Sequence, residues 1–254
     1  MNSVPEAYLG VWQRTLLRTA DGREDRSTQV FWLQTAQGHA DIRVPQRDPL
    51  TLLQRVSQAG FAGITQVQGD RCQWHRLIDF HPAGRVDIGI MHFVTPDEVH
   101  ETAPDRSYLE VWKRLPGSMQ SNQTIWLATE ENPSRQACLL RAGDWFIFAA
   151  DRQQSLQAGV ALEDQLKGLA ADKADALLGC ELSFGRITGD VPWTISLSTL
   201  PGRSGKCLSA EALADDIQCW TDAQLQYLGS YPPRSGWQRT AQPVVNFPAL
   251  EGTA

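Results

Sequence analysis

Short apolar stretches, separated by polar turn sequences, recur through the first hundred residues of the chain. They are rich in Val, Ile, Phe and Trp, and they are broken by DG, QG, GD and PAG sequences. This pattern predicts β-strands joined by tight turns. The expected strands are Leu9–Leu17, Ser27–Gln34, Ala40–Val44, Gly63–Gln68, Gln73–Phe80 and Arg85–Val94.

Two segments place their apolar residues at helical spacing instead. A short helix is expected over Pro49–Gln58, and a longer amphipathic one over Gln154–Leu178. The stripe of the longer helix consists of Leu156, Val160, Leu162, Leu166, Leu169 and Leu177. Its polar face mixes both charge signs, so we expect it to pack on a sheet rather than on a membrane.

Three sequence matches divide the chain into two halves. YLGVWQR at 8–14 matches YLEVWKR at 108–114, and FWLQT at 31–35 matches IWLAT at 125–129. A weaker match follows in the same order, between GFAGIT at 60–65 and SFGRIT at 183–188. The common order predicts a tandem duplication, with domains at 1–104 and 105–254.

Regularly spaced short strands are typical of a β-barrel or a β-sandwich. A closed barrel is favoured because it leaves no unpaired strand edge in a unit of roughly 100 residues. We therefore expect an all-β fold with accessory helices, built as two antiparallel barrels. The second barrel would carry the helix near 154–178 and a C-terminal extension.

Composition and charge narrow the range of partners. The 254 residues include 23 basic and 29 acidic side chains, and this net charge of −6 argues against a nucleic-acid partner. No run approaches 18 apolar residues, and the first ten lack the pattern of a signal sequence, so we expect a cytoplasmic protein without membrane insertion.

The sequence contains none of several common motifs for binding a cofactor or a metal. The five cysteines form no C-x-x-C pair, and the chain has no H-E-x-x-H, P-loop, G-x-G-x-x-G or G-x-S-x-G motif. We therefore expect reduced thiols, no metal and no cofactor.

The candidate chemistry lies in the first half. All five histidines are there, at positions 39, 75, 81, 92 and 100. The densest polar segment is Cys72–His81, where strand alternation predicts that Cys72, Trp74, Arg76 and Ile78 share one face. His75 and Asp79 would lie on the opposite face, each free to meet a group on a neighbouring strand.

A second polar pair, Asp41 and Arg43, leaves two orientations open. If both side chains point inward, the barrel has a polar interior in which Arg43 could bind a carboxylate or carbonyl group. If Ile42 and Val44 point inward instead, the pair is solvated and contributes little.

The aromatic residues and the remaining histidine are open to a structural interpretation as well. Trp32 and Trp74 are typical of barrel lining, which does not prevent them from stacking on a ligand. His92 could face a cavity or form a structural hydrogen bond.

Gly10-Val11-Trp12, at the start of the first expected strand, resembles the G-x-W signature of the lipocalin or calycin group. The resemblance implies that the Trp closes one end of the barrel and that an Arg packs over its ring. Arg14, or Trp237 with Arg239, could supply this stacking. Glu110 replaces the glycine in the second half, which departs from the signature.

The chain as a whole resembles a family of uncharacterised proteins with two lipocalin-like barrels, which includes a yeast protein known as a partner of a casein-kinase-1 homologue. The residues that carry the resemblance are YLGVWQR, FWLQT followed by ADIRVP, QAGFAGIT, CQWHRLIDFHP and YLEVWKR. The resemblance implies a fold and little chemistry, with a protein partner only by analogy.

Three functions compete at this point. The first is binding of a small apolar or aromatic molecule in the first barrel, through Arg43, Trp32, Trp74, Arg76 and His92. The second is a cofactor-free isomerase, cyclase or hydrolase that uses His75, Asp79 and Asp41 as acids or bases. The third is a scaffold for protein interaction.

Overall fold

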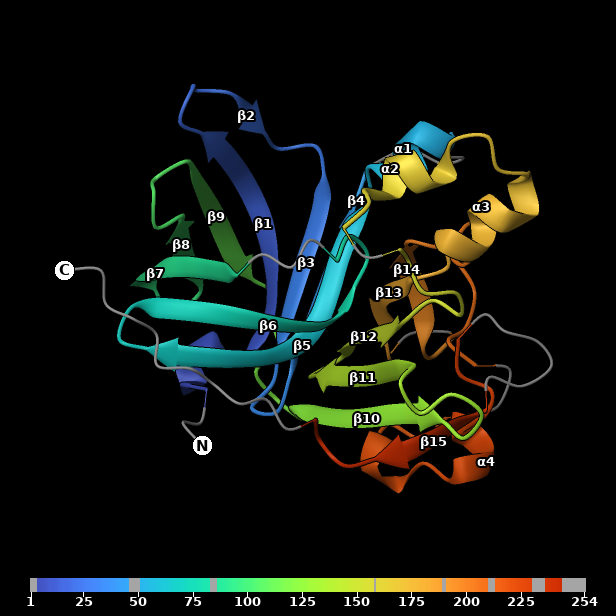
Figure 1. The fold of residues 1–254 in the computed structure, drawn as a ribbon. Helices are drawn as coiled ribbons and strands as arrows, with labels where there is room; N and C mark the ends of the chain where they lie inside the picture. The colour runs from blue at the N-terminus through green and yellow to red at the C-terminus, as the bar shows by residue number, and fades with distance from the viewer. Residues whose placement is uncertain are drawn as a thin grey trace.

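The computed structural model describes residues 4–45, 51–82, 86–157, 159–188, 191–209, 213–229 and 236–243. It contains two antiparallel sheets, with short helices at their edges (Figure 1). The strands of the first sheet are β1 (Gly10–Thr19), β2 (Glu24–Asp25), β3 (Gln29–Gln34), β4 (His39–Val44), β5 (Ala59–Gln68), β6 (Arg71–Asp79), β7 (Asp87–Thr95), β8 (Glu98–Thr102) and β9 (Tyr108–Arg114). The all-β class with accessory helices is confirmed.

Eight strands of the first sheet close into a barrel. β1 pairs with β3 on one side and with β9 on the other, while β2 forms only a short addition to β1. YLEVWKR, which the sequence predicts to begin a second unit, is therefore the strand that completes the first barrel. The barrel ends at Arg114 and not near residue 104, and the division into two domains stays a prediction.

The second sheet has six strands, in the order β14-β13-β12-β11-β10-β15. They are β10 (Gln123–Thr129), β11 (Gln136–Ala142), β12 (Trp145–Ala150), β13 (Glu181–Arg186), β14 (Thr194–Ser198) and β15 (Trp237–Thr240). Over the described residues the two outer strands do not pair, so this sheet is open where a second closed barrel is expected from the sequence.

The long helix predicted at 154–178 is two shorter helices, α2 (Leu162–Leu166) and α3 (Ala171–Leu177). Gly168 follows α2 with a φ of +72°, a conformation that ends helices and that glycine adopts without steric cost. The predicted helix at 49–58 is observed as α1 (Leu52–Val56), with residues 49 and 50 outside the described ranges.

The two sheets share one strand order over six strands. β9-β1-β3-β4-β5-β6 of the first corresponds to β15-β10-β11-β12-β13-β14 of the second, with helices between the fourth and fifth strands. The match of GFAGIT with SFGRIT agrees with this correspondence, since it falls on β5 and β13. FWLQT and IWLAT occupy different places in the two orders, and the tandem duplication stays a prediction.

The outer surface of the barrel on β3–β6 packs against one face of the second sheet. Ile42 and Val44 belong to this shared core, together with Leu140 and Leu182 of the second sheet. The opposite face of the second sheet carries a separate core, which includes residues of the 3₁₀-helix η2 (Ile217–Cys219) and of α4 (Asp222–Leu225).

One end of the barrel is filled by aromatic side chains. The N-terminal 3₁₀-helix η1 (Glu6–Tyr8) places Tyr8 at this end. The backbone carbonyl of Tyr8 accepts a 2.8 Å hydrogen bond from Nε1 of Trp12. Arg114, from the last barrel strand, lies 4.2 Å above the Trp12 ring. The expected stacking is thus supplied by Arg114 and not by Arg14, whose guanidinium forms ion pairs with carboxylates.

The stacking of Arg239 on Trp237, which the sequence also suggests, is not observed either. The ring of Trp237 is covered by Arg135, at 4.4 Å, and not by Arg239. Arg239 donates instead to backbone carbonyls of η2 and its cap.

Candidate functional site

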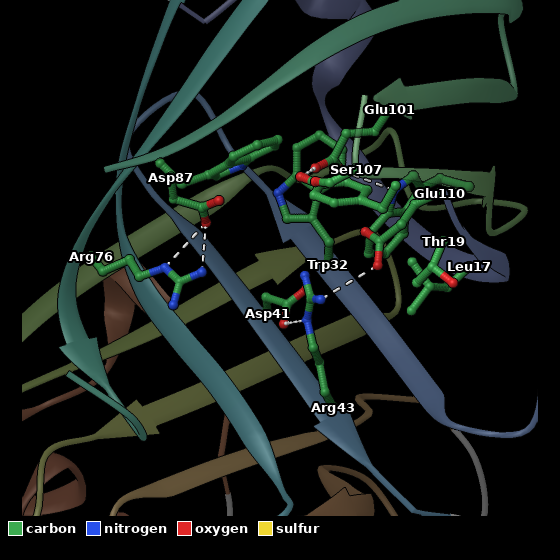
Figure 2. A pocket seen from close by; sticks show the side chains of 13 residues that line it. Leu17, Thr19, Trp32, Asp41, Arg43, Arg76, Asp87, Glu101, Ser107 and Glu110 are labelled. Atoms are coloured by element: carbon green, nitrogen blue, oxygen red, sulfur yellow. Dashed lines mark hydrogen bonds and ion pairs between the residues drawn. The ribbon is translucent and has the colours of Figure 1, made fainter. Parts of the chain in front are cut away.

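The end of the barrel opposite Trp12 opens into a pocket of about 470 Å³. Its lining combines aromatic rings with charged side chains (Figure 2). The lining residues are Leu17, Thr19, Trp32, Asp41, Arg43, Trp74, Arg76, Asp87, Glu101, Ser107, Tyr108, Glu110 and Trp112.

Strand alternation directs the polar residues of β4 into this pocket. Asp41 and Arg43 point inward, because Ile42 and Val44 on the opposite face are needed in the core shared with the second sheet. This resolves the two orientations that the sequence leaves open. The same alternation on β9 turns Tyr108, Glu110 and Trp112 into the pocket.

Arg43 connects two carboxylates within the pocket (Figure 2). Its Nε donates to Asp41 at 2.7 Å, and Nη1 lies 3.5 Å from Glu110. Burial raises the pKa of Asp41, although the charge of Arg43 opposes that effect. About 29% of the Arg43 side chain stays exposed, and it lines the pocket, so this side chain can contact a bound molecule.

Glu110 is held from the other side by Arg14. The Nη1 of Arg14 lies 2.6 Å from Glu110, and its Nη2 lies 2.8 Å from Asp25 at the edge of the barrel. Arg14 and Glu110 are both almost completely buried. Such a pair adds little net stability after desolvation, but it fixes where the charges lie.

Glu101, on β8, has hydrogen-bond donors instead of a cation beside it. The hydroxyl of Tyr108 donates to one oxygen at 2.9 Å, and Nε1 of Trp112 donates to the other at 3.1 Å. Burial, and then the neighbouring charge of Glu110, raise the pKa of Glu101 to about 8. The carboxyl group therefore keeps its proton at neutral pH.

Three tryptophans form the aromatic wall of the pocket. Trp32 lies centrally, with ring centroids 5.7 Å from Trp74 and 5.9 Å from Trp112, both in edge-to-face geometry. Below it, Trp12 stacks on Trp32 at 6.0 Å. This packing holds the rings of the wall in fixed positions.

Arg76 borders the pocket from β6. Its guanidinium lies 3.7 Å above the ring of Phe61 and 2.7 Å from the carboxylate of Asp87 on β7. A longer contact of 3.3 Å joins it to Asp79. Arg76 is thus oriented from three sides, with Asp87 as its main ionic partner.

The residues predicted to bind a ligand fall into two groups. Trp32, Trp74, Arg43 and Arg76 all line the barrel pocket. His92 does not line it, because it is exposed on β7 between Met91 and Phe93, which belong to the barrel core. The interpretation of His92 as a cavity residue is therefore corrected by the alternation of its strand.

The residues predicted to act in catalysis are divided between two places. Asp41 lines the barrel pocket, whereas His75 and Asp79 line a separate depression of about 600 Å³ that also borders Arg152 of the second half. Burial lowers the pKa of His75, which favours the neutral form of its imidazole.

A β-bulge explains why the predicted faces of β6 are only partly right. The register shifts opposite Ala62 and Gly63, so that Leu77 is left unmatched and the alternation is reversed beyond it. Ile78 consequently packs in the core shared with the second sheet, while Trp74 stays inside the barrel.

Several pocket residues were missed from sequence, namely Leu17, Thr19, Asp87, Glu101, Ser107, Tyr108, Glu110 and Trp112. A usable pattern was present for some of them, since Tyr108, Glu110 and Trp112 alternate within one segment. What the sequence did not disclose was that this segment closes the first barrel.

Two further findings concern the described ranges only. No group of three or more His, Cys, Asp or Glu side chains there could hold a metal ion. None of the helices in these ranges has the length and apolar character needed to cross a membrane.

An eight-stranded antiparallel barrel, with a Trp–Arg closure at one end and a pocket at the other, defines a lipocalin-like fold. Among solved structures, an uncharacterised protein from Saccharomyces cerevisiae is similar over 92% of this chain and 99% of its own. The identity is 11% and the TM-score 0.59, so the likeness shows a common fold.

A lipocalin-like protein from Bacteroides uniformis is also found, over 43% of this chain and 99% of its own, at 14% identity and a TM-score of 0.33. No protein-family model matches the chain, and no curated protein matches it.

Proposed function

We propose that the first barrel binds a small molecule with a flat apolar body in the pocket at its open end. The observation that carries the proposal is the combination of the three-tryptophan wall with ordered polar groups in one pocket of about 470 Å³. Ligand sites are commonly built in this way, with an apolar surface for affinity and a few fixed polar groups for orientation.

The size of the pocket supports the same proposal. Its volume falls within the roughly 300–1,000 Å³ that small-molecule sites occupy. Small closed barrels are either filled by side chains or hold one small ligand, and here the filling stops at the level of Trp32.

The catalytic alternative has weaker support. It requires acids or bases that converge on one pocket, and Asp41 lines a different one from His75 and Asp79. Glu101 has a raised pKa of the kind found in general acids, but both of its oxygens are already engaged by Tyr108 and Trp112.

A pocket-filling variant tests the binding proposal. Ser107 lies at the rim, and Ser107→Trp would place a large side chain in the pocket without removing any of its charged groups. A thermal-shift screen of neutral, anionic and cationic aromatic compounds should raise the Tm of the wild-type protein and leave that of the variant unchanged.

Ser134→Trp, at an exposed position outside the barrel, serves as the control and should respond as the wild type does. If no class of compound stabilises the wild type, or if Ser107→Trp responds equally, the pocket is not a binding site.

A further inference from the structure

The charged groups of the pocket are not evenly balanced. Four carboxylates line it, on Asp41, Asp87, Glu101 and Glu110, against the two guanidinium groups of Arg43 and Arg76. The guanidinium of Arg14, buried next to the pocket, adds a third cation, which Glu110 shares with Asp25 outside the pocket lining. The pocket therefore has more carboxyl groups than cations to pair with them.

The ion pairs show which carboxyl group is left without a cation. Arg43 is paired with Asp41, Arg76 mainly with Asp87, and Arg14 with both Glu110 and Asp25. Within the described part of the chain, Glu101 takes part in no ion pair and accepts only the neutral donors of Tyr108 and Trp112. It is also only 4% exposed, so bulk water does little to stabilise its charge.

Charged or titratable side chains on four neighbouring strands influence the pKa of Glu101. Glu110 on β9 and Asp87 on β7 oppose its ionisation, whereas Arg43 on β4 and the hydroxyl of Tyr108 favour it. The thiol of Cys72 on β6 also interacts with Glu101, and burial raises the pKa of that thiol well above its usual range, so it stays neutral. None of these groups supplies the missing positive charge.

We propose that the ligand supplies this charge: the pocket binds an organic cation whose ammonium or amidinium group lies beside Glu101 and whose flat apolar body lies against Trp32, Trp74 and Trp112. The inference rests on the proposed binding function and specifies the class of ligand.

Two physical effects favour a cation at this place. A carboxylate in a buried, low-dielectric site gains more from an added positive charge than it would in water. Tryptophan faces also attract cations, so that the aromatic wall contributes to binding the charged end as well as the apolar body.

An anionic or neutral ligand would gain less. Arg43 and Arg76 are already held by carboxylates, so an anion would have to compete with Asp41 or Asp87 for them. It would also lie among the carboxylates of Asp41, Asp87 and Glu110, which repel a negative charge. A neutral ligand would leave Glu101 protonated and would gain only apolar contacts and hydrogen bonds.

Cation binding would also move a proton. At pH 7 the Glu101 carboxyl is protonated, and an ammonium group beside it favours the carboxylate form. One proton then leaves the carboxyl for the buffer while the ammonium group keeps its own. Close to one proton should therefore be released per bound cation at pH 7, and much less at pH 9.

The test uses three compounds that share one aromatic body: 1-naphthylmethylamine, 1-naphthylmethanol and 1-naphthoate. Isothermal titration calorimetry on the full chain should give at least a tenfold lower Kd for the amine than for the other two. Titration in two buffers of different ionisation enthalpy measures the proton release.

Glu101→Gln keeps the shape of the side chain and removes its charge. This variant should weaken binding of the amine at least tenfold, abolish the proton release and leave binding of the alcohol unchanged. Glu98→Gln, on the same strand but paired with His100 on the outer surface, is the matched control and should bind as the wild type does.

The outcomes separate the two proposals. If the alcohol or the naphthoate binds as tightly as the amine, the charge inference is wrong while small-molecule binding stands. If none of the three binds, both proposals fail for ligands of this size. Should Glu101→Gln not fold, the wild-type comparison and its proton release decide alone, and amine binding without proton release contradicts the inference.

Discussion

At the scale of single residues, Glu110 shows how a departure from a signature can place a charged group in a pocket. The residue at the matching position of the first heptapeptide is Gly10, whose φ of +113° few other residues adopt. From sequence, Glu110 appears only as a loss of the calycin glycine. In the structure its carboxylate accepts from both Arg14 and Arg43 and forms part of the pocket.

The protonation of Glu101 makes a prediction about stability. Its pKa is about 8 in the folded protein and near 4.5 in an unfolded chain, so between these values the folded state holds a proton that the unfolded state has lost. Stability contributed by this group is therefore complete at low pH and falls as the pH rises towards 8.

Urea denaturation at pH 5.5 and pH 8.5 measures this effect. Because each pKa unit corresponds to about 1.4 kcal/mol, the free energy of unfolding of the wild type should fall by roughly 3 kcal/mol relative to Glu101→Gln over this range. Parallel pH profiles for the two proteins would show that Glu101 ionises normally when buried.

At the scale of elements, glycine permits the close approach of β5 and β6 at the bulge. A Cβ placed on Gly63 would lie 1.8 Å from the backbone oxygen of His75, which cannot move without disturbing the strand pair. The corresponding Gly185 on β13 has its neighbour, the oxygen of Thr194, at 2.1 Å. Both sheets therefore depend on a glycine at the same place in their strand order.

Gly63→Ala should consequently separate the two strands and destabilise the protein by about 2 kcal/mol or more. The control is Gly22→Ala, where φ is +84° but no atom lies within 4 Å of the new Cβ, so that only the backbone cost of about 1 kcal/mol is expected. The loss of Tm in each variant, measured by thermal unfolding, compares the steric clash at residue 63 with the backbone cost at residue 22. A smaller loss at Gly63 than at Gly22 would contradict the steric explanation.

Element by element, the six strands predicted for the first half are observed, but the pattern missed the short β2 and also β8, which carries Glu101. Arg43, Arg76, Trp32 and Trp74 could be proposed as a set because they lie on strands whose alternation the sequence records. Local pattern is uninformative where a bulge reverses the faces, as it does after Arg76. Local pattern also does not show which distant strand closes a barrel. β1 and β9 are about a hundred residues apart, and their pairing is decided by tertiary packing.

At the scale of the whole molecule, the second sheet covers an apolar outer surface of the barrel that would otherwise be exposed to water. The outward-facing barrel residues in the shared core are Val11, Leu33, Ala40, Ile42, Val44, Ala62, Ile64, Ile78 and Phe80. Polar contacts fix the orientation of the two sheets: Thr35 and Thr124 are hydrogen-bonded at 2.6 Å, and Arg152 donates to the carbonyl of Phe80 at 2.8 Å. An exposed apolar surface of this kind promotes association.

Two fragments test this account of the division of the chain. Residues 1–116 contain every strand of the barrel, so this fragment should acquire β-structure by circular dichroism but self-associate in analytical ultracentrifugation through its uncovered face. Residues 1–104 lack β9, which leaves β1 and β8 unpaired on facing edges and removes Glu110 and Trp112 from the pocket. The shorter fragment should therefore fail to fold. A monomeric, stable 1–104 fragment would show that the unit ends where the sequence matches alone place it, and that the pairing of β9 with β1 is not needed to hold the barrel together.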